Sequence, residues 1–592
     1  MSEPETKPKF GHEMRLLAAS LLSMSVILLW TRFLAPKPSV LQPQANRSAQ
    51  SAPVNPGVSN PTTSSSSTAT PAATPKGNAT GISATKPVNV AAKSDTEERT
   101  IVVENDLYRV EFSNRGAVVK SWRLKKYMDD SKPQRVLDVV HPEAAQQTGG
   151  WPFALVMDDD QLQSAANDGL YQTASSGTLQ APADAEFSWS DGHLEVTKHF
   201  RFDHTYVVHV ETTVEMNGVP VIAGLAWLGG FGDLTVLNPA PIDTVSVFSN
   251  ESGKLTNTAA KKLEGPEKWG AGVWQGGKNW TGIEDRYFTA AFLAPVGAAP
   301  GSLETRCWKV ERTIQVDGKD SQEVVPQLAT AAAQPLALRV YVGPKDYDDL
   351  KKMNPPLHSL VNFGWLEFIA DPLFHGLKWL HNYIPNWGWA IVVLTLVINM
   401  LLFPLRISSY KTTLKMQRVG PEIKQIQDKY KKYTMRDPRK AEMNKEVMAV
   451  YSREGINPVG GCFQMFLQMP IWFGLNTTLR YAIEMRHAQW FGWITDLSAK
   501  DPYYVLPVFM GLSMYLVSKM TPMTSTDPQQ QMMMKIMPVT MAGIFMISPI
   551  SSGLAVYILT SSLVGILQQF WLNRQHPAPA VSGKQLAKSK KS

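Results

Sequence analysis

The stretch that decides the fold is IVVLTLVINMLLFPLR (residues 391–406), which is apolar except for Thr395, Asn399 and the closing arginine. A run of this kind forms most of a helix that can cross the hydrocarbon layer of a membrane. An amide side chain in that layer is unfavourable unless it finds a hydrogen-bonding partner. Asn399 therefore indicates that this helix faces a polar neighbour or a wet surface.

Apolar runs of similar length recur elsewhere in the 592 residues. They predict six membrane-spanning helices, at about 14–34, 387–406, 458–480, 503–520, 535–550 and 551–573. The first run could also be a signal peptide, but no clear small-x-small cleavage site follows it, so we expect an uncleaved helix. The fifth run is only about 22 Å long as a helix, against a hydrocarbon core of about 30 Å. We expect it to thin the bilayer or to be buried by its neighbours.

Basic residues in two segments predict the orientation of these helices. Residues 406–454 hold thirteen Lys or Arg against six Asp or Glu, and the tail after residue 573 is basic with no acidic residue. The positive-inside rule places both segments in the cytoplasm. With six helices the N-terminus is also inside, and the long segment between the first two helices is outside.

That outside segment has two parts. Residues 36–98 are rich in Pro, Ser, Thr, Ala and Asn, which is typical of a flexible tether. Residues 99–345 change to a period of two, as in TYVVHVETTVEM (205–216), where alternate residues are apolar. This alternation, interrupted by Gly, Pro and Asn-Gly, predicts a large antiparallel β-sandwich.

Helical periodicity returns after the β-domain. Residues 355–384 carry an apolar stripe with Trp and Phe, interrupted at Asp371–Pro372, which indicates an amphipathic helix on the membrane surface or one packed against the β-domain. Residues 407–456 show two amphipathic stripes on either side of TMRDP, which predicts a cytoplasmic helical hairpin. The expected domains are residues 1–35 (first helix), 36–98 (tether), 99–345 (β-sandwich), 355–384 (interfacial helix), 387–573 (five-helix core with the hairpin) and 574–592 (basic tail).

Uncharged polar side chains recur at helical spacing in three of the predicted spans. Thr395 and Asn399 are four residues apart, as are Gln464 and Gln468 and also Tyr557 and Ser561. The six runs contain no Asp or Glu, which disfavours a proton- or sodium-coupled transporter. Such amides can simply join helices, but stripes on three helices are also typical of a shared hydrophilic groove.

The hairpin and tail are candidates for contact with ribosomal RNA or anionic lipid, although their charge can also serve only to fix topology. The basic residues predicted to make this contact are Lys424, Lys429, Lys431, Lys432, Arg436, Lys584, Lys588, Lys590 and Lys591.

Few features of the sequence support an enzyme activity or a bound cofactor. GVWQGGKN (272–279) imitates a phosphate-binding loop but ends in asparagine, which has no hydroxyl for Mg²⁺. No Cys/His cluster has metal-ligand spacing, so we expect no metal and no cofactor. Two alternatives stay open: a transporter or channel with an extracytoplasmic sensor domain, and a membrane-anchored enzyme acting on cell-wall sugars.

Long motifs in the chain resemble the YidC/Oxa/Alb3 family of membrane protein insertases. They are NPVGGCFQMFLQMPIWFGL (457–475), DLSAKDPYYVLPVFMG (496–511), TDPQQQMMMKIMP (526–538) and SSGLAVYILTSSLVGILQQ (551–569). NFGWLEFIADPLFHGLKWLH (362–381) is similar to the amphipathic helix that precedes the family's core. YVGPKDYDDL (341–350) and NWTGIEDRYFTAAFLAP (279–295) resemble the periplasmic domain of the Gram-negative form.

The resemblance implies a non-enzymatic insertase and chaperone in the bacterial inner membrane, with the β-domain in the periplasm. It implies nascent membrane proteins as substrates, and the ribosome, the Sec translocon and the phospholipid bilayer as partners. In the family a groove opens to the cytoplasm and to lipid. The residues expected to line it here are Thr395, Asn399, Phe403, Arg406, Gln464, Gln468, Trp472, Asn476, Tyr557 and Ser561.

One position departs from the family pattern. The family typically has an arginine in the groove where this chain has Asn399, and Arg406 lies two helical turns further on. We expect Asn399 to line the groove as a neutral hydrogen-bonding group and Arg406 to be a candidate for the displaced charge.

Overall fold

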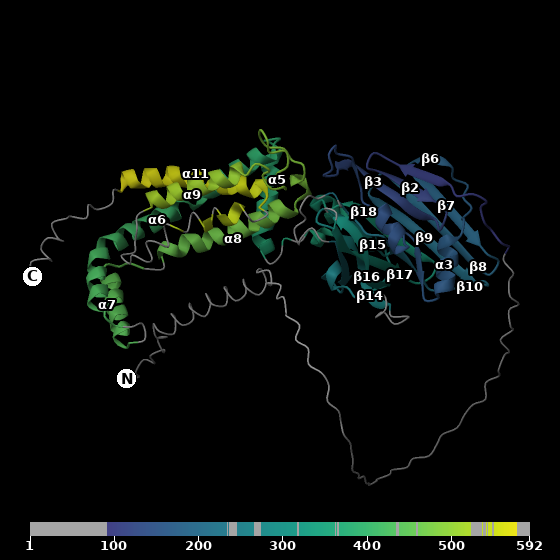
Figure 1. Cartoon of the computed structure of the whole chain (residues 1–592), viewed down its shortest axis with the longest axis horizontal. Helices are drawn as coiled ribbons and strands as arrows, with labels where there is room; N and C mark the ends of the chain where they lie inside the picture. The colour runs from purple at the N-terminus through teal and green to yellow at the C-terminus, as the bar shows by residue number, and fades with distance from the viewer. Residues whose placement is uncertain are drawn as a thin grey trace, which may run out of the picture. The chain divides into compact units, whose positions relative to one another are not determined.

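The computed structural model describes residues 91–576 except for 234, 236–244, 266–273, 317–318, 362, 364–365, 434–436, 458–459, 522–535, 537–539, 542 and 547–549. The chain divides into two units, Met1–Ser83 and Ala84–Ser592. The predicted first helix (14–34) and most of the predicted tether fall outside the described residues. The second unit contains a β-domain followed by a helical region (Figure 1).

The described part of the β-domain contains two sheets. The larger, thirteen-stranded sheet has the order β5-β11-β17-β16-β14-β15-β18-β9-β8-β7, with β10, β12 and β13 paired alongside, and the smaller sheet has the order β4-β3-β2-β1-β6. The strands of the larger sheet are β5 (Leu155–Met157), β7 (Ala183–Ser190), β8 (Leu194–Phe202), β9 (Val207–Met216), β10 (Val219–Pro220), β11 (Ala223–Trp227), β12 (Ser246–Glu251), β13 (Lys254–Ala259), β14 (Gln275–Glu284), β15 (Phe288–Leu293), β16 (Leu303–Val316), β17 (Lys319–Ala331) and β18 (Leu336–Pro344). Those of the smaller sheet are β1 (Thr100–Glu104), β2 (Tyr108–Ser113), β3 (Val118–Met128), β4 (Val136–Asp138) and β6 (Gly177–Gln180).

The alternation seen in the sequence places one face of each strand in the core. On β9, Val208, Val210, Thr212 and Val214 are buried, while the residues between them are partly or fully exposed. The expectation of purely antiparallel pairing is wrong at one place, because β1 pairs with β6 in parallel. These two strands are far apart in the sequence, and the long connection between them allows a parallel return.

A lysine lies in this core. Lys198 occupies an inward-facing position of β8 and is fully buried. Its Nζ donates hydrogen bonds to the carbonyl oxygens of Gly116 and Phe153, each at 2.7 Å, and of Ala117 at 3.4 Å. Burial lowers the pKa of Lys198 to about 7. The side chain thus joins β8 to the chain segments that lead into β3 and β5.

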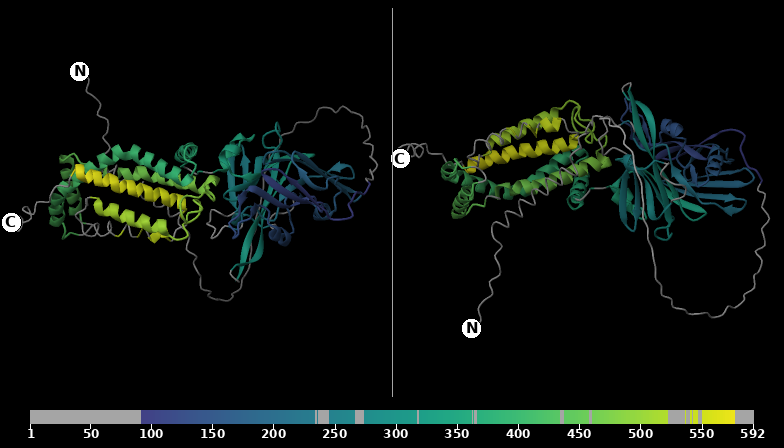
Figure 2. Two further views of the ribbon diagram at one scale, coloured as in Figure 1. Left: turned by 90° about the horizontal axis from the view of Figure 1, so that it is seen from above. Right: turned by 60° about the horizontal axis from the view of Figure 1, so that its bottom comes forward.

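The described helices fall into two groups. Those of the β-domain are short: α2 (Pro142–Thr148), α3 (Asp160–Asp168) and α4 (Tyr347–Lys352), with 3₁₀ turns η2 (Ala260–Lys262) and η4 (His358–Leu360). The helical region contains α5 (Glu367–His381), α6 (Trp387–Lys429), α7 (Arg439–Arg453), α8 (Gly460–Tyr481), the 3₁₀ turn η6 (Ile483–Met485), α9 (Val505–Met520) and α11 (Ser552–Gln575). Helices α6, α8, α9 and α11 lie side by side (Figure 2).

Helix α6 is one continuous helix of 43 residues, so the predicted span 387–406 and the first stripe of the predicted hairpin belong to the same helix. Asn386 caps its start by accepting a hydrogen bond from the backbone N–H of Trp389 at 3.1 Å. Pro404 and Pro421 lie inside the helix. The change from apolar to basic sequence marks a change of surroundings, and it does not interrupt the backbone hydrogen bonds.

Helix α5 begins at Glu367 and contains Pro372, so the expected helix over 355–384 is shorter than predicted and Asp371–Pro372 does not interrupt it. Its buried face, with Phe374 and Leu377, packs against neighbouring elements, and the hydroxyl of Thr478 on α8 donates to the carbonyl oxygen of Ala370 at 3.1 Å. The helix also exposes large apolar side chains, namely Phe368 and Trp379.

Two of the described helices, α6 and α11, are long and apolar enough to cross a membrane, and α9 is a shorter apolar helix. Helix α8 coincides with the predicted span 458–480. Half of the predicted span 535–550 falls among residues that the structure does not describe.

We predict that Lys198→Met destabilises the protein, because three buried carbonyl oxygens lose their donor. Each lost hydrogen bond contributes about 1 kcal/mol, so the free energy of unfolding of the β-domain should fall by about 3 kcal/mol. Thermal unfolding of the full chain in detergent, followed by tryptophan fluorescence, measures the change.

The matched control is Lys126→Met, because Lys126 is exposed on β3. It should change stability by less than about 0.5 kcal/mol. Between pH about 7 and 10.5 the unfolded chain retains a proton that Lys198 has released, so stability should rise with pH in wild type. A similar rise in the Lys198→Met variant would show that another group causes it.

Candidate functional site

Asn399, the amide in the opening stretch, pairs with helix α11. It is almost fully buried, and its Nδ2 donates to the hydroxyl oxygen of Ser561 at 3.3 Å and to the carbonyl oxygen of Thr395 in its own helix at 2.9 Å. The Ser561 hydroxyl in turn lies 3.4 Å from Asn399 Oδ1, to which it donates. Both distances across the helices are long for hydrogen bonds of their type. The pair is therefore satisfied but loosely held.

Arg406 extends the same contact two turns toward the C-terminal half of α6. Its Nη1 donates to Gln568 Oε1 at 2.8 Å, and its Nη2 donates to the carbonyl oxygen of Gly565 at 3.3 Å. The amide of Gln568 donates to the carbonyl oxygen of Asn399 at 3.4 Å, so one side chain of α11 bridges both positions. The two partners of Arg406 are neutral oxygen atoms.

The row of polar contacts continues to the end of α11. The Tyr410 hydroxyl donates to Asn573 Oδ1 at 2.7 Å, and Asn573 Nδ2 donates to the carbonyl oxygen of Met520, the last residue of α9, at 3.2 Å. We call this row along α6 and α11 the polar seam. Its members are Asn399, Arg406, Tyr410, Ser561, Gln568 and Asn573.

A second polar link joins α8 to α11. Gln468 Nε2 donates to the hydroxyl oxygen of Tyr557 at 2.8 Å, and the tyrosine ring is buried. Tyr557 and Ser561 lie one turn apart on α11, so this helix carries the polar partners of both α6 and α8. Helix α11 is thus the common element of the site.

The structure brings some of the predicted groove residues together and separates others. Asn399 contacts Ser561, and Gln468 contacts Tyr557. Phe403 contacts Trp571 with ring centroids 5.6 Å apart, and Trp472 packs on Phe473 at 4.6 Å. The structure places Arg406 in the seam, leaves Asn476 partly buried on α8 and does not describe the side chain of Gln464.

Thr395 has a local partner instead. Its hydroxyl donates to the carbonyl oxygen of Ile391 in its own helix at 2.7 Å, and the side chain is fully buried. The sequence analysis missed Gln568, Asn573 and Tyr410. A signal for them existed, because Asn399, Arg406 and Tyr410 follow a spacing of seven and four residues, which is one face of a helix.

The basic hairpin has an apolar centre and a charged surface. Val419 and Ile423 of α6 pack with Val450 of α7 and with Ile456. Of the predicted contact residues, Lys424, Lys431 and Lys432 are exposed, and Lys429 is also exposed but pairs with Glu446 at 2.8 Å. Arg436, Lys584, Lys588, Lys590 and Lys591 fall outside the described residues.

In the described helices, the side chains of the site are neutral amides and hydroxyls together with one guanidinium. Amide, hydroxyl and guanidinium groups face one another between helices whose apolar runs contain no Asp or Glu. Interhelical hydrogen bonds of this kind contribute about 0.6 kcal/mol each on average. Each contact of the site is therefore weak when taken alone.

Two sequence families match the chain and together cover most of the described part. The family described as "YidC periplasmic domain" matches residues 100–376, and the family described as "60Kd inner membrane protein" matches residues 379–579. The first range contains the β-domain and the second contains the polar seam.

Two relatives that match over nearly their full length are both described as membrane protein insertases. A membrane protein insertase YidC from Syntrophus aciditrophicus is 32% identical over 572 residues, which are 94% of this chain and 99% of that protein. Another from Geotalea uraniireducens is 31% identical over 583 residues, or 96% and 100% of the two chains. A solved structure titled "Active YidC insertase crystal structure with the first transmembrane domain resolved" is 17% identical with a TM-score of 0.33, and covers 81% of this chain and 94% of that one.

The pairing of α6 with α11 predicts a disulfide between engineered cysteines. In a background where Cys307 and Cys462 are serine, Asn399→Cys with Ser561→Cys should cross-link under mild oxidation, because these side chains are hydrogen-bonded neighbours. Mass spectrometry of the peptides measures the yield.

The matched control pairs Asn399→Cys with Leu563→Cys. Leu563 is half exposed and lies two residues from Ser561, on another face of α11. It should cross-link weakly. Equal yields in the two pairs would contradict the packing described for α6 and α11.

Proposed function

The chain belongs to the YidC family of membrane protein insertases, and we propose that its polar seam is the surface along which the polar part of a substrate enters the membrane. The protein is a membrane protein insertase of the inner membrane with a periplasmic β-domain. Its activity is insertion rather than covalent catalysis, and membership of this family replaces the transporter and sugar-enzyme alternatives.

The proposed topology has six spans, with both termini in the cytoplasm. The basic content of residues 406–454 and of the tail supports this orientation, because Lys and Arg are retained on the cytoplasmic side. In this orientation the N-terminal end of α6 is periplasmic, and Arg406 lies closer to the cytoplasm than Asn399. The basic hairpin then lies beside the cytoplasmic end of the polar seam.

The observation that supports a substrate route is the pairing within the seam. Its groups are satisfied by one another through several long hydrogen bonds, so the resting protein leaves few of them unpaired in hydrocarbon. A hydrophilic substrate segment can exchange its own donors and acceptors for these partners. The seam then serves as a groove only when a substrate opens it.

Arg406 is proposed to supply the electrostatic attraction that the family places at the position of Asn399. Its guanidinium donates hydrogen bonds to neutral oxygens, so no carboxylate neutralises it there. Its permanent charge and its planar set of donors suit the binding of an acidic group. An acidic tail would therefore be recognised near the cytoplasmic entrance and passed to neutral groups at mid-depth.

The proposed partners are nascent membrane proteins, the ribosome, the Sec translocon and the surrounding bilayer. The exposed lysines of the hairpin, Lys424, Lys431 and Lys432, support contact with a polyanionic surface such as ribosomal RNA. Insertase activity itself accounts for the nascent substrates.

We predict that Asn399→Leu reduces insertion of substrates with charged translocated segments by about tenfold, because Ser561 loses its partner and the route loses a polar group. Asn399→Arg should be tolerated, since the family accommodates that residue. A depletion-complementation assay with a protease-accessibility readout measures insertion.

Thr395→Val is the matched control, because the Thr395 hydroxyl bonds only to its own helix in the structure. It should insert the same substrates at the wild-type rate. Full activity of the Asn399→Leu variant on highly charged substrates would count against a polar route at this depth.

Arg406→Gln should impair substrates with acidic translocated tails about tenfold more than substrates with neutral tails, since hydrogen bonds to a charged group contribute roughly 1.5–3 kcal/mol. Arg406→Lys should recover part of the loss. The control is Arg418→Gln, an exposed arginine on the same helix. If both tails lose activity equally, Arg406 supports helix packing and not charge recognition.

A further inference from the structure

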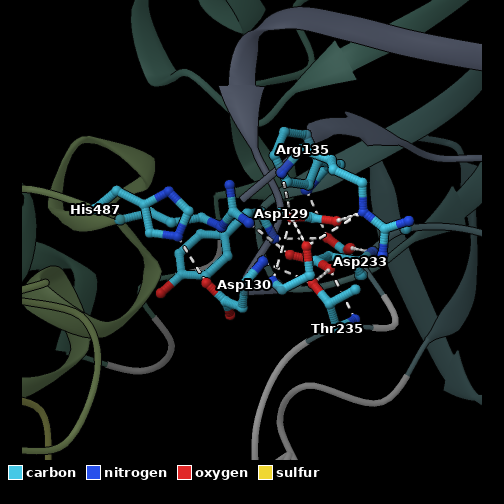
Figure 3. Close-up of polar contacts among 12 residues, drawn as sticks. Asp129, Asp130, Arg135, Asp233, Thr235 and His487 are labelled. Atoms are coloured by element: carbon cyan, nitrogen blue, oxygen red, sulfur yellow. Dashed lines mark hydrogen bonds and ion pairs between the residues drawn. The ribbon is translucent and has the colours of Figure 1, made fainter. Parts of the chain in front are cut away.

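The loop between α8 and α9 contacts the β-domain within the same compact unit. Arg486 pairs with Asp233 at 2.5 Å, and both side chains are buried. The next residue, His487, places its Nε2 2.6 Å from Oδ1 of Asp130, which follows strand β3 (Figure 3). Two adjacent residues of the loop therefore reach two separate acidic residues of the β-domain.

A third acidic side chain completes a group around His487. Asp496, further along the same loop, offers a carboxylate oxygen such that one atom from each of Asp130, His487 and Asp496 lies within 4.8 Å of the others. Within the described part of the chain, this is the one group of three such side chains that is close enough to hold a metal ion. All three are partly buried, so water can reach the centre.

The arginines near this group are paired with acidic residues outside it. Arg486 is neutralised by Asp233, and Arg135 lies 3.8 Å from a carboxylate oxygen of Asp129, to whose other oxygen its backbone N–H also donates. These two arginines are therefore already paired with other acids. Asp130 and Asp496 are left with a single imidazole between them.

Two carboxylates that face one imidazole form an electronegative centre, which a divalent cation would neutralise. Backbone N–H groups of Ser498 and Ala499 hold one oxygen of Asp496, at 2.7 and 3.3 Å. The backbone N–H of Asp130 donates to the hydroxyl of Thr235 at 2.7 Å (Figure 3). The Asp496 carboxylate and the backbone of Asp130 are thus each held by residues outside the group.

The backbone of His487 has a positive φ of 56°, which is uncommon for a residue other than glycine. In this conformation the imidazole lies beside the Asp130 carboxylate.

We propose that Asp130, His487 and Asp496 form a binding site for a divalent cation of the zinc class, which fastens the β-domain to the loop between α8 and α9. Imidazole nitrogen with carboxylate oxygen suits Zn²⁺ and related transition metals, whereas Ca²⁺ and Mg²⁺ prefer oxygen ligands alone. Tetrahedral zinc places its ligand atoms about 3.3 Å apart, so small side-chain rotations suffice. Water takes the fourth position.

Binding changes the protonation of the histidine. In the pair with Asp130, an N–H at Nε2 donates to the carboxylate; a bound cation needs the lone pair of Nε2, so the proton of the neutral ring must lie on Nδ1. The cation then replaces one hydrogen bond with three metal–ligand bonds. This site is independent of the proposed substrate route, because it lies on the periplasmic side of the chain.

The experiment uses the full-length protein in detergent, stripped with a chelator and then titrated with zinc chloride. Bound zinc is measured by mass spectrometry after desalting, and thermal unfolding is recorded with and without zinc. Wild type should retain one zinc ion per chain at this site and unfold at a higher temperature when zinc is present.

Asp496→Asn is the decisive variant, because Asp496 takes no part in the His487–Asp130 hydrogen bond. It should lower zinc affinity at least about tenfold and remove the zinc-dependent rise in unfolding temperature, as should His487→Gln and Asp130→Asn. The control is His199→Gln. His199 also pairs with an aspartate, Asp184 at 3.3 Å, but lacks a third ligand.

Zinc binding by Asp496→Asn that equals that of wild type would overturn the proposal and reduce the group to a hydrogen-bonded pair. The same conclusion follows if His199→Gln lowers zinc affinity as much as His487→Gln. Loss of zinc in the three ligand variants, with unchanged insertion by wild type after chelation, would still support the site and separate it from the insertase activity.

Discussion

A polar group placed among apolar helices must find its partner inside the protein, and this constraint governs the helical region. Asn399, Arg406 and Tyr410 lie on one face of α6, and each is satisfied by a side chain or carbonyl group of α11. Hydrocarbon offers no competing donor or acceptor, so these partners fix which faces of the two helices meet. Each of these contacts is weak when taken alone.

The same constraint bears on the proposed route along the polar seam. In that proposal, a substrate that supplies hydrogen bonds of equal quality opens the seam without further work. Asn399 is neutral, and the nearest charge on α6, Arg406, lies two turns further toward the proposed cytoplasmic side. In the proposed route, this chain therefore offers a neutral polar group at Asn399 and a positive charge at Arg406.

Polar groups buried in the β-domain also have hydrogen-bonding partners within the protein. Lys198 is tolerated in an apolar core because its Nζ donates hydrogen bonds to the surrounding carbonyl oxygens and burial lowers its pKa to about 7. At the loop between α8 and α9, Arg486 and Asp233 are buried as a pair. Beside them, Asp130 and Asp496 face a single histidine, and this imbalance of charge distinguishes that group from the neighbouring ion pairs.

The sequence by itself determined the apolar runs, the alternating strands, the basic segments and, through long motifs, the insertase family. These features are local, because they depend on composition and on the fixed periods of helix and strand. Tertiary structure alone decided that α6 continues past Arg406, that Thr395 turns to its own helix, and that Asn399 meets Ser561, 162 residues away. Such pairings depend on the rotation and register of packed helices. The periodicity of either helix restricts the face that can be used, but the partner is selected only when the two surfaces pack together.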